Sequence, residues 1–88
     1  MHAVVFIVDR KQDWTGDLEQ ELDQMTGAVK SAPGFIRGTW TGNAHHGISL
    51  LLFDSEQAAR AVADSAALPP DASARFRSVD VYPVARDV

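Results

Sequence analysis

Six apolar residues in a row, AVVFIV at positions 3–8, leave this chain few ways to fold. Such β-branched and aromatic residues, followed by the polar run that begins at Asp9, are typical of a β-strand. Successive side chains of a strand point to opposite faces, so apolar groups lie on both sides of this one. The sequence therefore predicts a strand over residues 2–9 that is covered on both faces.

Two later segments have the spacing of amphipathic helices. In the first, apolar side chains recur at intervals of four, three and four residues, at Leu18, Leu22, Met25 and Val29. We expect Thr15 to cap this helix and Pro33-Gly34 to end it. The second helix opens at Asp54 or Ser55, either of which suits an N-cap, and an alanine-rich run follows until Pro69.

Three further segments have strand character: residues 35–41, 48–53 and 76–84. The turn-rich stretch 42–47 predicts a hairpin between the first two of them. Strict alternation of side chains places Phe35 and Trp40 on opposite faces of the earlier strand. In the last strand the same rule separates Phe76 from Val79.

The element order is β-α-β-β-α-β, the split β-α-β arrangement of the ferredoxin-like fold. This α+β fold has a four-stranded antiparallel sheet, ordered fourth, first, third, second, with both helices on one face. With 88 residues and no linker, we expect one domain over residues 1–88. Because the central strands are apolar on both faces, a second copy of the chain is the simplest cover for the side opposite the helices. We therefore predict a homodimer formed through the open sheet face.

With this order established, the segments SAPGFIRGTWT (31–41) and GISLLLFDSEQAARAVAD (47–64) resemble the dimeric α/β-barrel superfamily, and within it the antibiotic-biosynthesis-monooxygenase-like group. The resemblance implies a dimer whose two sheets face each other, and a ligand cleft between the sheet and the helices of each protomer. It also implies a range of activities, which includes cofactor-independent oxygenation of aromatic molecules and heme degradation.

The heme-degrading branch of that group relies on an Asn in the first strand, a Trp at the end of the third strand and a His on the following helix. In this chain the first strand has no Asn, the third ends at Phe53-Asp54, and the second helix has no His. No residue of that triad transfers, and we do not expect heme degradation.

Aromatic side chains are the first candidates for contact with a ligand. We take Phe6, Trp40 and Tyr82 as residues of the cleft, and we add Trp14 and Asn43 as further ligand contacts. Three of them have a structural interpretation as well. Trp40 would fill the core or the dimer interface, Trp14 would pack on the first helix instead of forming a lid, and Asn43 would serve the turn.

His45 and His46 are the candidate catalytic residues, as general bases, with solvated turn histidines as the alternative. Neighbouring side chains of an extended segment point to opposite sides, so these two cannot hold one metal ion from one strand. His2 is the only other histidine, and a zinc site needs three or four ligands. We therefore expect no metal and no cofactor.

The formal net charge of −4 disfavours nucleic acids and anionic membranes as partners. Single basic residues such as Arg10, Arg37 and Arg77 could bind an anionic group, although surface ion pairs are the simpler explanation. The absence of cysteine excludes disulfides and a thiolate nucleophile. No basic region precedes the first apolar run, so we expect no signal peptide and a cytoplasmic protein.

The sequence thus predicts a homodimer that shelters a small apolar or aromatic molecule between sheet and helices. Two alternatives stay open. One is a cofactor-independent monooxygenase acting on an aromatic or quinol substrate, in which Trp40 positions the substrate and His45 or His46 removes a proton. The other is a structural homodimerisation module that binds no small molecule.

Overall fold

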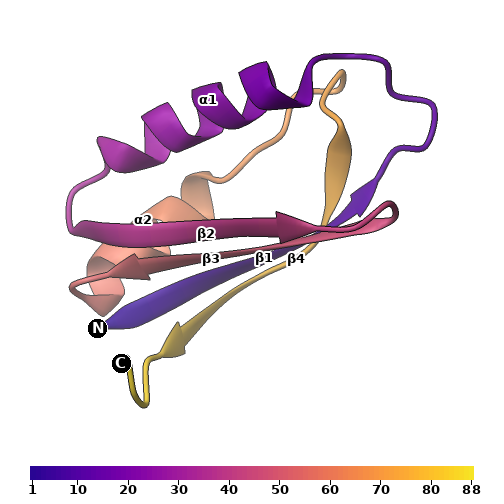
Figure 1. Cartoon of the computed structure of the whole chain (residues 1–88). Helices are drawn as coiled ribbons and strands as arrows, with labels where there is room; N and C mark the ends of the chain where they lie inside the picture. The colour runs from indigo at the N-terminus through magenta and orange to yellow at the C-terminus, as the bar shows by residue number, and fades with distance from the viewer.

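The elements follow one another in the order that the sequence predicts. In a computed structural model that describes residues 1–88, they are β1 (His2–Arg10), α1 (Leu18–Lys30), β2 (Phe35–Gly42), β3 (His46–Phe53), α2 (Glu56–Ser65) and β4 (Ala74–Pro83) (Figure 1). The strands form one antiparallel sheet in the order β2-β3-β1-β4. The ferredoxin-like α+β fold is therefore confirmed, with β1 and β3 in the central positions.

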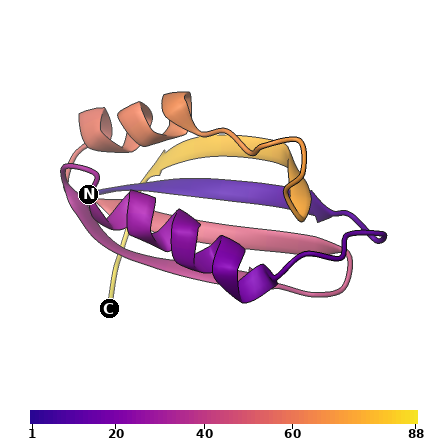
Figure 2. The same cartoon turned by 90° about the horizontal axis from the view of Figure 1, so that it is seen from above.

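Both helices cover the same face of the sheet, and the opposite face, called the open face below, carries no helix (Figures 1 and 2). The two apolar sides of β1 therefore have different surroundings. Its even-numbered residues point toward the helices, where Val4 and Phe6 join the buried core of Leu51, Phe53 and Ala59. Its odd-numbered residues point to the open face.

The two helices approach the sheet differently. Ala59 of α2 is fully buried, because its small methyl group lets this helix lie close against β1 and β4. α1 has no buried residue, although its apolar stripe is directed toward the sheet. α1 therefore stands off the sheet and leaves space beneath it. Neither helix is long and apolar enough to cross a bilayer.

The helix starts depend on side chains that accept free backbone N–H groups. Asp17 caps α1, because its carboxylate accepts the N–H of Gln20 at 3.2 Å. The prediction of Thr15 as the cap was wrong, and Asp17 also places a negative charge at the positive end of the helix dipole. Ser55 caps α2 with its hydroxyl, which decides between Asp54 and Ser55.

A bulge near the start of β2 resets the alternation of its side chains. Phe35 pairs with Phe53 and Arg37 pairs with Leu52, so Ile36 is an extra residue on this strand. Phe35 consequently packs edge-to-face on Phe53, with ring centroids 5.8 Å apart, and belongs to the core on the helix side. The prediction that Phe35 lies opposite the Trp40 face was therefore wrong.

A second bulge has the same effect on β4. Phe76 pairs with Val8 and Ser78 pairs with Ile7, which leaves Arg77 as the extra residue. Phe76 therefore shares the helix-facing side with Val79, contrary to the prediction from strict alternation. Its ring stacks on Phe6 of β1, with centroids 5.4 Å apart.

The open face is apolar at its centre. Val5 pairs with Leu50 and Ile7 pairs with Ile48 across the two central strands. Leu50 is 41% exposed and Ile48 is 49% exposed, which is unusual for large aliphatic residues in the middle of a sheet. This surface is the part of the fold that lacks a cover.

Candidate ligand-binding site

A trough lies between the helices and the sheet, in the space that α1 leaves open. Its larger part has a volume of about 290 Å³, and 12 of its 14 lining residues are hydrophobic. Aromatic and aliphatic side chains from both helices and all four strands form its walls, among them Phe6, Val29, Trp40, Leu51, Val62 and Phe76. We call this part the apolar end of the trough.

A second part, of about 230 Å³, continues the trough toward the start of α1. The two parts share four lining residues, which are Met25, Trp40, Ser49 and Leu68. The walls of the second part include a guanidinium group, a carboxylate and a hydroxyl, from Arg10, Glu21 and Ser73. This polar end gives the trough a direction, since one end suits hydrocarbon and the other suits polar groups.

Trp40 lies where the two ends of the trough meet. It is paired across the sheet with Ser49 of β3, so both side chains face the helices. Gly38 makes room for the indole, because a Cβ at that position would lie 2.7 Å from Leu51 and 3.0 Å from the Trp40 ring. Trp40 therefore packs beside Gly38 and lines the trough at the same time. The indole N–H and the Ser49 hydroxyl make no hydrogen bond within the chain.

Glu21 anchors α1 at the polar end. Its Oε2 accepts the backbone N–H of Ser73 at 2.9 Å, and its Oε1 accepts the Ser73 hydroxyl at 2.5 Å. Ser73 is buried and lies next to the first residue of β4. The pair thus ties the helix that stands off the sheet to the strand at the sheet's edge.

We expect Glu21→Ala to lower the free energy of unfolding by about 1–3 kcal/mol, because two donors of buried Ser73 lose a charged acceptor. Urea denaturation measures this change. Glu19→Ala, at an exposed acidic position of the same helix, is the control and should change stability by less than about 0.5 kcal/mol. Equal stability of the two variants would contradict the anchoring role of Glu21.

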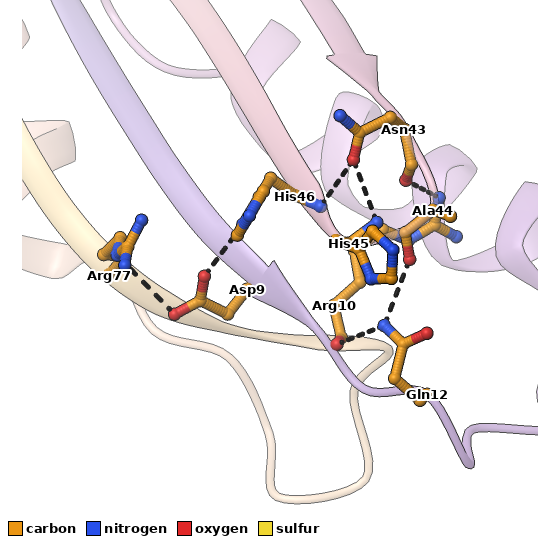
Figure 3. Close-up of polar contacts among 8 residues, drawn as sticks. All are labelled: Asp9, Arg10, Gln12, Asn43, Ala44, His45, His46 and Arg77. Atoms are coloured by element: carbon orange, nitrogen blue, oxygen red, sulfur yellow. Dashed lines mark hydrogen bonds and ion pairs between the residues drawn. The ribbon is translucent and has the colours of Figure 1, made fainter.

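The two candidate catalytic histidines lie at the β2–β3 hairpin (Figure 3). Neither of them lines the trough. The Asn43 side-chain oxygen accepts the backbone N–H groups of His45 at 2.9 Å and His46 at 2.8 Å, so Asn43 shapes this turn. His46 Nδ1 lies 3.0 Å from one carboxylate oxygen of Asp9, and Arg77 Nε lies 3.8 Å from the other. Asp9 and His46 are paired across β1 and β3, and their side chains lie on the open face of the sheet.

The aromatic candidates divide into two pairs. Phe6 and Trp40 line the trough. Trp14 does not: its indole N–H donates to the backbone oxygen of Asp71 at 2.9 Å, which ties the β1–α1 loop to the α2–β4 loop. Tyr82 lies on the outer strand β4, paired with Ala3 on the open face, and is 52% exposed.

Four residues of the polar end and the floor were absent from the predicted site. Arg10 was considered only as an isolated basic residue, while Glu21 and Ser73 carried no sequence signal that joins them across the chain. Ser49 did carry one, because it is the single polar residue in the apolar run ISLLLF. A lone hydroxyl in a buried central strand indicates a polar group that faces a cavity or a partner.

These features define a ferredoxin-like α+β protein with a mainly apolar trough between its helices and its sheet. No protein-family model matches the sequence, and no curated protein matches it either. Solved structures do share the fold, and three of them are of the heme-degrader MhuD of Mycobacterium tuberculosis.

MhuD with two hemes bound in its active site has a TM-score of 0.70 and 18% sequence identity, over 100% of this chain and 99% of that chain. A variant with two manganese protoporphyrin IX molecules per active site has the same score and identity, over 100% and 98% of the two chains. The heme-free, cleaved protein has a TM-score of 0.62 and 24% identity, over 100% and 96%. The likeness spans both chains from end to end. At these identities it confirms the ferredoxin-like fold.

Proposed function

We propose that this chain is a homodimeric protein that binds a small apolar or aromatic molecule in the trough. The observation that supports the proposal most is the position of α1. This helix has no buried residue, and its apolar stripe lines a hollow in place of a packed core. Helices of this length depend on tertiary packing for their stability, and a ligand in the trough would supply the missing contacts.

The size of the trough sets the expected affinity. A two-ring aromatic molecule that buries roughly 200 Å² of apolar surface would gain about 5 kcal/mol, before the costs of association are subtracted. A free energy of about 5 kcal/mol corresponds to a dissociation constant of roughly 0.2 mM, and the association costs weaken binding further, so titrations need protein at about 100 μM or above.

Heme, which MhuD binds, does not fit the residues of this trough. No histidine, cysteine or tyrosine lines it to bind an iron atom, and the one lining carboxylate, Glu21, is held by Ser73. His2, His45 and His46 all lie outside it, and no group of three or more His, Cys, Asp and Glu side chains lies close enough to hold a metal ion. The trough therefore has no side chain that could bind the iron of heme, and heme is not the ligand that we propose.

The proposed dimer forms through the open face. Its aliphatic residues, the exposed Ile48 and Leu50 and the half-buried Val5 and Ile7, would be covered by the same residues of a second copy, as the two-fold symmetry of most homodimers requires. The helices and the trough would then face outward on both subunits. Ligand binding and dimer formation would thus use opposite faces of one sheet.

The fluorescent probe N-phenyl-naphthylamine, an uncharged aromatic amine, tests ligand binding. We expect its emission to rise on titration with the protein, and we expect Ala28→Phe to reduce its affinity about tenfold or more. Ala28 lies on α1 and lines the apolar end, so a phenyl group there would occupy part of the trough. Fluorescence titration measures both affinities.

Gln24→Phe is the matched control. Gln24 is exposed on the same helix and does not line the trough, so its variant should bind the probe as the unchanged protein does. Ligand binding also raises the melting temperature by mass action. The purely structural alternative predicts neither a rise in emission nor a rise in melting temperature, and that result would overturn the proposal.

The monooxygenase alternative needs a base beside the substrate. His46 has the partner that orients a general base, since Asp9 lies 3.0 Å away, but this pair is on the open face. The sheet separates it from a ligand in the trough of the same subunit. The arrangement therefore favours binding over proton removal at this site.

A further inference from the structure

The hydrogen-bonding groups of the trough define a narrower class of ligand. We propose that the molecule bound in the trough carries an anionic group, such as a carboxylate, on its apolar body, and that Arg10 binds this group at the polar end. The inference rests on the proposed function, because it concerns the same trough. It adds the chemistry of the ligand and the residue that recognises it.

Arg10 is a charged group without a charged partner. It ends β1 on the side that faces the helices, in line with Val8 and Phe6, and it lines the polar end. Its Nη1 donates to the backbone oxygen of Asn43 at 2.9 Å. Its backbone N–H donates to the backbone oxygen of His45 at 2.8 Å. These two bonds hold the residue in place. No carboxylate lies within ion-pair distance of the guanidinium, whereas Arg37, Arg60 and Arg77 each have one. Arg75 and Arg86 have no ion pair either, but of the arginines only Arg10 lines the trough.

Glu21 does not fill this role, although it lines the same end of the trough. Both of its oxygens accept hydrogen bonds from Ser73, and no ion pair joins it to Arg10. Its charge is therefore directed to the start of β4. The remaining guanidinium N–H groups of Arg10 are left without a carboxylate, and guanidinium groups bind carboxylates through two parallel hydrogen bonds.

The floor of the trough has the same excess of donors. The indole N–H of Trp40 has no acceptor within the chain, and the hydroxyl of Ser49 opposite it is free to donate as well. Together with Arg10, these groups run from the middle of the trough to its polar end. A ligand with oxygen acceptors at one end and hydrocarbon at the other matches this order, and a wholly apolar ligand leaves the donors unpaired.

A pair of probes that differ by one anionic group tests the proposal. Anilinonaphthalene sulfonate has the same ring system as N-phenyl-naphthylamine and adds a sulfonate, which stands in for the carboxylate. We expect the sulfonate probe to bind more tightly, and Arg10→Gln to weaken its binding about tenfold, as the loss of a charge-assisted hydrogen bond does. The uncharged probe should bind Arg10→Gln as well as it binds the unchanged protein, which also confirms that the variant folds.

Three further variants complete the experiment. Arg10→Lys keeps the charge but not the paired donors, so its affinity for the sulfonate probe should lie between those of Arg10→Gln and the unchanged protein. Arg60→Gln removes an exposed arginine of α2 that pairs only with Glu56, and it should have no effect. Ala28→Phe should weaken both probes, because both lie in the trough.

The outcomes separate this inference from the proposed function. Equal binding of the sulfonate probe by Arg10→Gln and the unchanged protein would overturn the role of Arg10, while binding of the uncharged probe would still support the trough. Sulfonate binding that persists in Ala28→Phe would overturn the inference too, because the probe would then lie elsewhere. Failure of the uncharged probe to bind the unchanged protein would instead overturn the proposed function.

Discussion

Leu50→Asp is expected to convert the proposed open-face dimer into monomers. Leu50 lies at the centre of the open face, paired with Val5, and is 41% exposed in the single chain. Each subunit would lose about 2 kcal/mol of the free energy gained by apolar burial. The loss occurs twice, because two-fold symmetry places Leu50 of both subunits in the interface. An unpaired carboxylate at a buried interface costs several kcal/mol more. The dissociation constant of the dimer should therefore rise about a thousandfold or more.

Analytical ultracentrifugation at micromolar concentration measures this change. Ala61→Asp, which adds the same charge on the exposed side of α2, is the control and should leave the dimer intact. If the unchanged protein sediments as a monomer, or if Leu50→Asp stays dimeric, the open face is not the interface. Binding of the uncharged probe in the trough would not decide this question, since the trough lies on the other side of the sheet.

The second large effect concerns the core. Phe53 is fully buried at the end of β3, where it contacts the edge of the Phe35 ring and belongs to the same cluster as Ala59. We expect Phe53→Ala to lower the free energy of unfolding by about 3–5 kcal/mol, because the lost apolar contacts leave a cavity. That is a large share of the roughly 5–15 kcal/mol that stabilises a typical domain.

Urea denaturation of Phe53→Ala and Phe53→Leu checks this prediction. The leucine variant keeps most of the buried volume and should lose about 1.5 kcal/mol or less. The slope of the transition should be unchanged if only stability differs. A loss below about 1 kcal/mol for the alanine variant would mean that the cluster around Phe53 relaxes to fill the space.

The fold was predictable because its signals are local and repeated. The run at residues 3–8 marks a strand apolar on both faces, and the spacing of Leu18, Leu22 and Met25 marks a helix. Once six elements follow in this order, few topologies remain. The bulges at Ile36 and Arg77 were not predictable, because an extra residue in a strand becomes visible only when its partner strand is known.

The site was harder to predict from the sequence, for a related reason. Phe6 and Trp40 were predicted as ligand contacts from their aromatic character, and both line the trough, whereas Tyr82, predicted on the same ground, lies on the open face. Glu21 and Ser73 are 52 positions apart, and only the folded chain joins them. The turn residues Asn43, His45 and His46 were predicted as site residues because of the chemistry of their side chains. In the structure the Asn43 side chain bonds to the backbone of the hairpin, and the His46 side chain bonds to Asp9.

The two bulges have a consequence for how the protein avoids uncontrolled association. Both fall on the outer strands of the sheet, β2 and β4, whose free edges would otherwise offer backbone groups to a strand of another molecule. A bulge interrupts the regular spacing of those groups and twists the strand, and at β4 the inserted residue is the charged Arg77. Fibril-like growth by edge addition is thereby discouraged at both borders, which is compatible with the proposed face-to-face dimer.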